Sequence, residues 1–271
     1  MGIVKNAATS YLSTQPEIQQ EGKYIYGIIR HSGPLEYGNI GIGKRADRVY
    51  SINFKDISAV VSNSPVIQYE ARRLNMIAHE TVLEEVMKEF TVLPVRFSTI
   101  SENNDDAGIQ RILAKDYQKF DDLLAKMEGK KELGLKVLAH ETAIYESITE
   151  KYEDIRTLRG KLLSLPADKT YHQRMKIGEM VSEALKKETR NYKKIILDML
   201  TPLTDDVKIN DNYGEMMILN AAFLIRNSSE NDFDQAVNDL DEKYGGLMTF
   251  KYVGTLPLYN FVNLEINTKG V

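Results

Sequence analysis

The sequence contains no cysteine and no tryptophan, and only 4 of its 271 residues are histidine. Without cysteine the chain can form no disulfide, thiolate nucleophile, zinc ribbon or cysteine-ligated cluster, and four scattered histidines offer little for another metal site. We therefore expect no metal or redox enzyme and predict no cofactor. The sequence also lacks any run of about 18 apolar residues, so no span of a lipid membrane is expected.

The charge balance contains no excess of basic residues. There are 35 Lys and Arg against 39 Asp and Glu, which gives a formal net charge of -4. Binding to nucleic acid needs a concentrated basic surface, so no nucleic-acid partner is predicted and a protein partner is favoured. The hydrophobic content of 42% is typical of a folded protein. The length predicts two domains, each with its own core.

The start of the sequence is polar. Residues 1–22 contain no apolar block of the length a signal peptide needs, so the chain is expected to stay in the cytoplasm. No helical or strand period is visible in this stretch either. We predict that residues 1–22 form a mobile N-terminal arm.

Residues 23–139 are predicted to form an N-terminal α+β domain. Runs of β-branched and aromatic residues predict strands at 23–30, 48–54, 57–62, 91–100 and 132–139. Apolar residues spaced three and four apart predict helices at 70–90 and 105–127, and Leu74 and Ile77 belong to the expected core face of the first.

Residues 140–271 are predicted to form a second α+β domain that ends in a C-terminal tail. Apolar positions from Ile148 to Met199 recur with helical spacing around a break at 166–168, which predicts a long antiparallel helical hairpin over about 142–201. Strands are expected at 207–210, 216–225 and 247–256. A helix is expected at 229–243, with Ser229 in a capping-box position.

A glycine-rich segment at Gly38–Lys44 matches the spacing G-x-x-x-x-G-K of a phosphate-binding loop. Such a loop needs a serine or threonine hydroxyl next, to reach magnesium, but the next residue is Arg45. It must also open a helix, whereas the sequence that follows is strand-like. We interpret the segment as a connection between strands.

Other catalytic or metal-binding motifs are incomplete. His79-Glu80 and His140-Glu141 begin like a zinc-protease helix, but the position one turn later holds Leu83 or Ile144 rather than a second histidine. The acidic segment at 102–106 lacks the ligand pattern of a calcium loop and is interpreted as a loop with a helix N-cap. Without a recognisable nucleophile motif, no enzymatic activity is predicted.

Six segments in order resemble the gas vesicle protein L/F family. They are Tyr24–Ile29, Ala59–Ser62, Leu93–Thr99, Glu132–Val137, Leu219–Ile225 and Gly254–Val262. The resemblance covers about residues 23–264. The sequence departs from the family pattern at Ser98, where glycine is usual, and at Thr255-Leu256, where a Pro-Trp pair is typical.

The resemblance implies two ferredoxin-like α+β domains with antiparallel sheets, the second carrying the long helical hairpin. It also implies a non-enzymatic, minor gas vesicle component in the cytoplasm. Such a protein would bind the small hydrophobic shell protein, and other minor gas vesicle proteins, and would assist nucleation and assembly of the vesicle.

For the partner interface, the resemblance points to two segments with six candidate residues: Pro94, Arg96, Phe97, Pro257, Tyr259 and Phe261. These residues have a competing interpretation, in which Arg96 pairs with a carboxylate and Phe97 fills a core. Two other functions stay open: a ligand-sensing module that binds nucleotide at Gly38–Lys44, and a scaffold whose protein partner docks on the hairpin.

Overall fold

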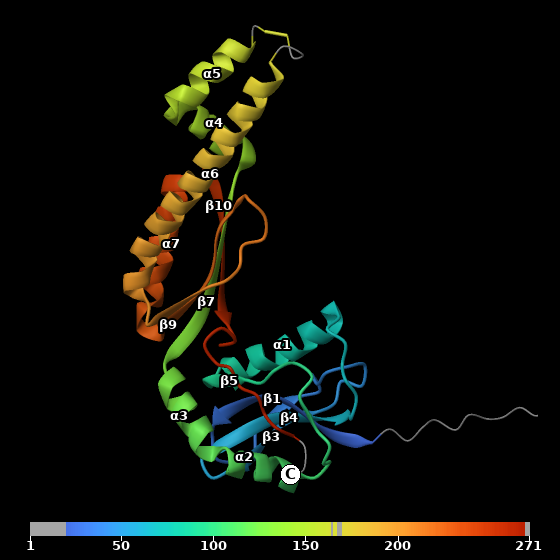
Figure 1. The fold of residues 1–271 in the computed structure, drawn as a ribbon. Helices are drawn as coiled ribbons and strands as arrows, with labels where there is room; N and C mark the ends of the chain where they lie inside the picture. Colours follow the sequence, from blue (N-terminus) through green and yellow to red (C-terminus); the bar gives the residue numbers. More distant parts are fainter. Residues whose placement is uncertain (1–19, 164, 167–169, 269–271) are drawn as a thin grey trace, which may run out of the picture.

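The computed structural model describes residues 20–163, 165–166 and 170–268, and these residues form two antiparallel sheets with helices. Figure 1 shows the two units end to end, with the first sheet at the bottom of the view and the second sheet and the long helices above it. The predicted α+β class with two antiparallel sheets is confirmed. The arm predicted at 1–22 lies outside the described residues up to residue 19, and the first strand already begins at Glu21.

The first sheet has the strand order β2-β3-β4-β1-β5, with β6 pairing the far end of β1. Its strands are β1 (Glu21–Arg30), β2 (Glu36–Gly38), β3 (Val49–Phe54), β4 (Ile57–Pro65), β5 (Val92–Pro94) and β6 (Ile100–Ser101). The strands predicted at 48–54 and 57–62 are present as β3 and β4, which pair antiparallel across the turn at Lys55-Asp56. Both faces of β1 are buried, which explains its almost unbroken apolar sequence.

Helices cover both faces of this sheet. Helix α1 (Arg73–Met87) packs on one face through Val82, Leu83 and Val86. Helices α2 (Asp106–Lys115) and α3 (Tyr117–Met127) pack on the other. One helix was predicted over 105–127, but the structure breaks it at Asp116.

Asp105 caps α2 as predicted, because its carboxylate accepts a hydrogen bond from the Gly108 amide at 2.8 Å. The prediction for the start of α1 was wrong. Leu74 and Ile77 were expected in the core, but the structure leaves them 81% and 50% exposed. They lie in the first turns of α1, whereas the residues that pack on the sheet lie further along the helix.

The second sheet has the strand order β10-β7-β9-β8, and all its neighbours are antiparallel. Its strands are β7 (Lys130–Ala139), β8 (Asp206–Ile209), β9 (Met217–Arg226) and β10 (Met248–Leu256). With the helices between them, the chain order is the β-α-β-β-α-β of a ferredoxin-like fold.

Strand β7 was predicted to belong to the first domain, which was expected to end at residue 139. The structure instead pairs β7 with β9 and β10, so its expected place in the first unit requires correction. The physical reason is that Leu133, Leu135 and Val137 point into the core under the helices of the second sheet. The change between the two sheets therefore comes before Lys130.

The predicted helical hairpin is present, but its first arm is broken. Helices α4 (Glu141–Lys151) and α5 (Glu153–Leu163) pack against α6 (Tyr171–Leu200), and Tyr152 between them is extended. Most of the break predicted at 166–168 lies outside the described residues. At 30 residues, α6 is about 45 Å long, and Figure 1 shows that it continues beyond the sheet to the hairpin tip.

Helix α7 (Glu230–Tyr244) lies beside α6 over one face of the second sheet. Two short 3-10 turns, η2 (Thr201–Leu203) and η3 (Asn227–Ser229), precede β8 and α7. The capping box predicted at Ser229 was wrong, because Ser229 ends η3 and its side chain makes no capping hydrogen bond. None of the helices that the structure describes combines the length and apolar character needed to cross a membrane.

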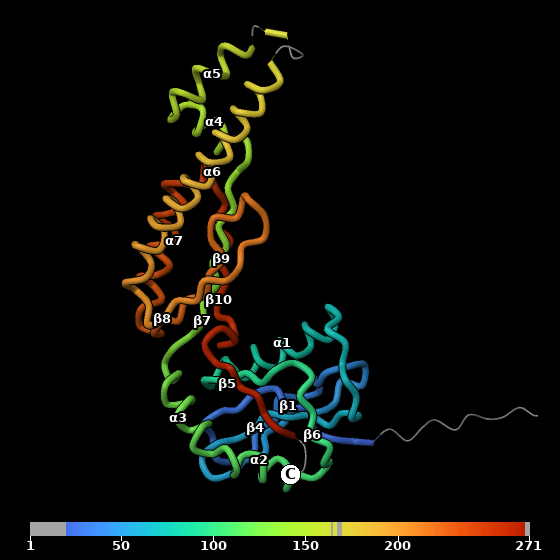
Figure 2. The backbone as a smooth tube through the Cα atoms, in the orientation of Figure 1, coloured from blue at the N-terminus to red at the C-terminus, as the bar shows by residue number. Residues whose placement is uncertain are grey.

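The C-terminal tail, residues 257–268, was predicted as part of the second domain but packs on the first. Leu258, Val262 and Leu264 are buried in the same cluster as Ile28 and Leu93 of the first sheet. Figure 2 shows this last part of the tube descending from β10 across the first unit. The tail therefore joins the two units a second time, after the direct connection from α3 to β7.

Candidate functional site

The two segments of the predicted interface lie against each other inside the chain. The segment 94–99 follows β5, and the tail 257–266 crosses it beside α1. We call this contact region the seam. Arg96 Nη2 lies 2.9 Å from Glu265 Oε1, so the predicted pairing of Arg96 with a carboxylate is present, although both side chains are exposed.

The six predicted residues have different surroundings in the seam. Pro94 and Pro257 are buried, Phe97 and Phe261 are partly buried, and Arg96 and Tyr259 are exposed. Phe97 packs against the cluster that contains α1, and Phe261 packs against the cluster on the opposite face of the first sheet. The structure therefore brings the two segments together but divides the six side chains between the two faces of the first sheet and its surface. Their role toward a partner stays a prediction.

His79 lies at the centre of the seam and is fully buried. The period of α1 places it on the same face as Val82, Leu83 and Val86, which lie three, four and seven residues further on. Its ring stacks on Tyr26 at 5.6 Å and meets the edge of Phe97 at 5.7 Å. The sequence indicated an incomplete zinc motif and a histidine on the helix surface, and the second interpretation was wrong, because His79 is buried.

Both nitrogens of His79 have tyrosine partners. Nδ1 lies 3.0 Å from the Tyr24 hydroxyl, and Nε2 lies 2.8 Å from the Tyr259 hydroxyl. The Tyr24 hydroxyl also accepts a hydrogen bond from the Ser98 amide at 2.9 Å. The tail residue Tyr259 is thus linked through α1 to the first strand.

Burial lowers the pKa of His79 to about 4, so the ring is neutral at pH 7. A neutral ring has one donor and one acceptor. With two hydroxyl partners, the neutral ring donates to one of them and accepts from the other. The Tyr259 hydroxyl also lies close to the carboxylate of Glu80, whose pKa is raised by burial and by nearby Glu84. Both ring nitrogens are therefore satisfied, and the network stabilises the seam.

Ser98 explains one departure from the family pattern. Its φ of 64° lies in the left-handed region, where glycine is favoured. The serine holds this conformation with two hydrogen bonds: its amide donates to Tyr24, and its hydroxyl accepts from the Tyr69 amide at 2.9 Å. The backbone shape typical of glycine is therefore kept by a different residue.

Glu132 of β7 connects the start of the tail to the second sheet through hydrogen bonds. Its side chain is 1% exposed. One carboxylate oxygen accepts from the Asn260 amide at 3.0 Å, and the other accepts from Asn260 Nδ2 at 2.6 Å. Burial raises the pKa of Glu132, and the two bonds from Asn260 act against that rise. No local sequence pattern indicated this contact, because its partners are 128 residues apart.

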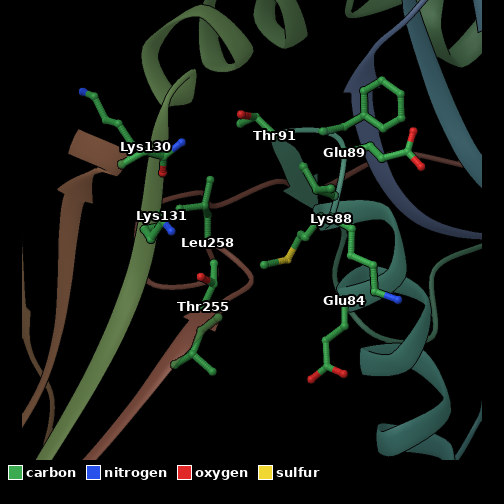
Figure 3. A pocket seen from close by; sticks show the side chains of 13 residues that line it. Glu84, Lys88, Glu89, Thr91, Lys130, Lys131, Thr255 and Leu258 are labelled. Atoms are coloured by element: carbon green, nitrogen blue, oxygen red, sulfur yellow. The ribbon is translucent and has the colours of Figure 1, made fainter. Parts of the chain in front are cut away.

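A cleft of about 490 Å³ separates the C-terminal end of α1 from β7 and β10. Figure 3 shows Glu84, Lys88 and Glu89 on the α1 side and Lys130 and Lys131 on the β7 side. The two β7 lysines already pair with other carboxylates, at 2.8 and 2.7 Å. In the part of the chain that the structure describes, no group of three or more His, Asp or Glu could hold a metal ion.

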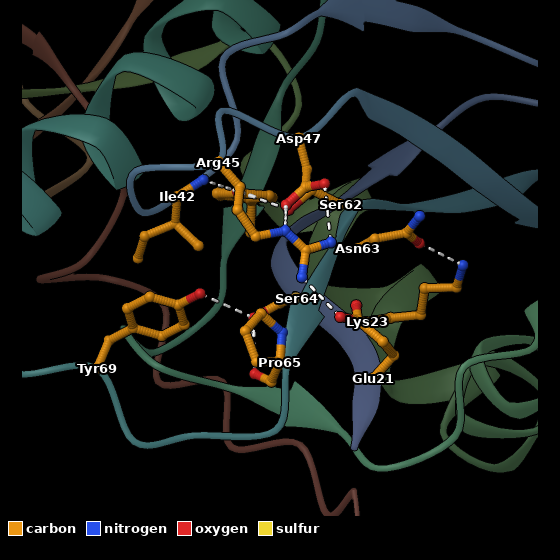
Figure 4. Close-up of polar contacts among 11 residues, drawn as sticks. Glu21, Lys23, Ile42, Arg45, Asp47, Ser62, Asn63, Ser64, Pro65 and Tyr69 are labelled. Carbon is orange, nitrogen blue, oxygen red and sulfur yellow. Dashed lines mark hydrogen bonds and ion pairs between the residues drawn. The ribbon is translucent and has the colours of Figure 1, made fainter. Parts of the chain in front are cut away.

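The glycine-rich loop at 38–44 is engaged in contacts within the protein, as Figure 4 shows. The Gly41 amide donates to the Asp47 carbonyl at 2.9 Å, and the Ile42 amide donates to the Tyr26 hydroxyl at 2.8 Å. The Arg45 guanidinium pairs with Glu21 and Asp47. Because the loop leads into β3 rather than a helix, it lacks the helix N-terminus that a phosphate-binding loop provides.

The exposed start of α1 adds an apolar surface next to the seam. Leu74 and Ile77 lie on one side of the helix, three residues apart, and the following residue on that side is Glu80, which Tyr259 contacts. We call Leu74, Ile77 and Tyr259 the α1 stripe. Contiguous exposed apolar residues of this kind are typical of protein-binding surfaces.

Comparison with known proteins decides the family. The family model described as "Gas vesicle synthesis protein GvpL/GvpF" matches residues 22–263. The chain belongs to the GvpL/GvpF family. The resemblance drawn from the six sequence segments is therefore confirmed.

Individual GvpL/GvpF relatives match over nearly their whole length. Gas vesicle protein F of a Nostoc species is 28% identical over 90% of this chain and 99% of its own. Gas vesicle protein F1 of Halobacterium salinarum is 28% identical, over 92% and 96%. The crystal structure of GvpF from an Anabaena species covers 90% of this chain and 99% of its own, with 26% identity and a TM-score of 0.76.

Proposed function

We propose that this chain is a minor, non-enzymatic accessory protein that acts in the cytoplasm in gas vesicle assembly. In this proposal it binds the small hydrophobic shell protein and, with other minor gas vesicle proteins, assists nucleation of the vesicle. The observation that carries the proposal is the family match over residues 22–263, which includes both sheets and most of the tail.

The surface we propose for the shell protein is the α1 stripe together with the exposed part of the seam. A hydrophobic subunit needs an apolar surface that is open before binding, and Leu74 is 81% exposed. Tyr259 offers an aromatic ring at the side of the same helix. Pro94 and Pro257, being buried, would act by fixing the backbone on which Arg96, Tyr259 and Phe261 are presented.

Co-purification of the chain with the tagged shell protein tests binding. Leu74→Glu and Ile77→Glu place charge on the stripe and are expected to lower the recovered complex at least tenfold. Met175→Glu is the matched control, because Met175 has the same 50% exposure as Ile77 but lies on α6. Equal recovery of all three variants and the unchanged protein would contradict the proposed surface.

Vesicle counts in cells that lack the gene for this chain test the accessory role. We expect few or no vesicles without the chain, and recovery when it is supplied from a plasmid. The Leu74→Glu variant should not restore the count, while Met175→Glu should. Normal vesicle numbers in the deletion strain would refute a role in nucleation, whatever the outcome of the binding experiment.

A further inference from the structure

Among the residues that the structure describes, no helix covers one face of the second sheet. Helices α6 and α7 pack on the face formed by Leu135, Phe223 and their neighbours. In Figure 1 the β8–β9 connection lies on the other side of the sheet. On that side β7, β9, β10 and the connection surround a depression of about 680 Å³.

Two lysines lie side by side in this depression. Lys136 of β7 is directly opposite Lys251 of β10 in the antiparallel register, which places their β-carbons about 5 Å apart. Like charges in such a pair destabilise a sheet. In the described part of the chain neither lysine has a carboxylate partner or a hydrogen bond, whereas Lys130 and Lys131 of the same strand each have an ion pair.

The carboxylates near the depression leave the two lysines unpaired. Glu132 is buried and its oxygens are occupied by Asn260. Asp211 lies on the β8–β9 connection and lines the depression, and in the described residues no ion pair joins it to either lysine. Neither lysine therefore has a carboxylate at ion-pair distance, and both remain available to a carboxylate from outside.

The depression also carries apolar side chains beside the two lysines. Gly134 and Ala222 are opposite each other beneath it, and the side chains of Val253 and Leu256 lie over Gly134. Tyr213 and Val253 are 75% and 53% exposed, which offers apolar contact. Two cations beside exposed apolar side chains match carboxylates that alternate with apolar side chains in an extended peptide.

We propose that this face binds an acidic, extended segment of a partner protein. The carboxylates of the segment take Lys136 and Lys251, and its apolar side chains contact Tyr213 and Val253. Two lysines form no track along which a nucleic-acid backbone could lie, which favours a short carboxylate peptide over a polyphosphate. The inference concerns a different surface from the α1 stripe and does not depend on shell-protein binding.

Fluorescence anisotropy with the full chain tests this proposal. The probe is a pool of labelled octapeptides. Each peptide has two aspartates or two glutamates, at all possible spacings, and its other residues are valine and leucine. The reference pool has asparagine in place of aspartate and glutamine in place of glutamate. We expect the acidic pool to bind at least tenfold more tightly. Lys136→Gln and Lys251→Gln should each weaken binding at least fivefold, while Lys176→Gln on exposed α6 should leave it unchanged.

Three results would overturn the proposal: equal binding of the two pools, equal binding by the two lysine variants and the control, or displacement of the peptide by an oligonucleotide at lower concentration. A stability measurement separates binding from a structural role. Because the lysines repel each other, Lys251→Gln should leave the urea midpoint unchanged or raise it. A lowered midpoint would mean that the lysine is structural, and would also overturn the proposal.

Discussion

The buried His79 makes the stability of the protein depend on pH in a defined window. Its pKa is about 4 in the folded chain and 6.5 as a free side chain. Below pH 6.5 the unfolded chain binds a proton that the folded chain does not, so acid favours unfolding. Stability from this group is fully present above pH 6.5 and is lost as the pH falls toward 4.

The size of the effect follows from the two pKa values. Each pH unit between them changes the free energy of unfolding by about 1.4 kcal/mol for one proton. Between pH 7 and pH 5 the contribution of His79 should therefore fall by about 2 kcal/mol. Other groups titrate in the same range. Burial raises the pKa of Glu80 and Glu132, so the histidine must be isolated by a difference between two proteins.

Urea unfolding of the unchanged protein and of His79→Gln at pH 7 and pH 5 provides that difference. Glutamine keeps an amide donor and acceptor but does not titrate. Far-UV circular dichroism is the suitable signal, since the chain has no tryptophan. The stability advantage of the unchanged protein should shrink by about 2 kcal/mol at pH 5. An advantage that is equal at both pH values would refute the reasoning and indicate a histidine that is protonated or exposed.

Four further substitutions have expected outcomes that urea unfolding can check. Tyr259→Phe removes the hydroxyl that is hydrogen-bonded to Nε2 of the buried histidine and should cost about 1–3 kcal/mol, and a cost near zero would mean that the bond is not formed in solution. Asn260→Ala leaves the carboxylate of Glu132 buried with one hydrogen bond instead of two, and should cost about 1.5–3 kcal/mol at pH 7 and less at pH 4, where the carboxyl is protonated more easily. Gly22→Ala would place a methyl group against the carbonyl oxygen of a residue in β6 and should cost about 1–3 kcal/mol, whereas Gly178→Ala, in open space on α6, should stabilise by about 0.5–1 kcal/mol. Equal effects of the two glycine substitutions would show that the β1–β6 contact is looser than described.

Local sequence patterns predicted most elements because each element has a period of its own. Helix α7 and strand β10 were found within one or two residues of their bounds. The period does not identify the partner of an element, however. Strand β7 has the alternation of a half-buried strand, and that alternation is equally compatible with either sheet. Its place depends on β9 and β10, which come about a hundred residues later.

The seam was predictable only in part. The ordered segments pointed to Arg96 and Tyr259, and the structure brings both into the seam. The buried residue at the centre of the seam, His79, has hydrogen-bond partners 55 and 180 residues away, which no local pattern contains. Leu74 shows a different failure, because at about 3.6 residues per turn it points away from the face of α1 that His79, Val82 and Val86 form against the sheet, so the predicted stripe combined two sides of the helix.

The return of the tail to the first sheet affects the order of folding during synthesis. Leu258, Val262 and Leu264 complete the core around β1, yet the ribosome makes them after every helix and strand of both units. Domains usually fold in order as they emerge, but here the unit made first lacks part of its core until the last segment is released. A nascent or prematurely terminated chain would therefore expose apolar surface that chaperones and proteases recognise. Only a chain translated past Leu264 could bury that surface and avoid chaperone binding and proteolysis.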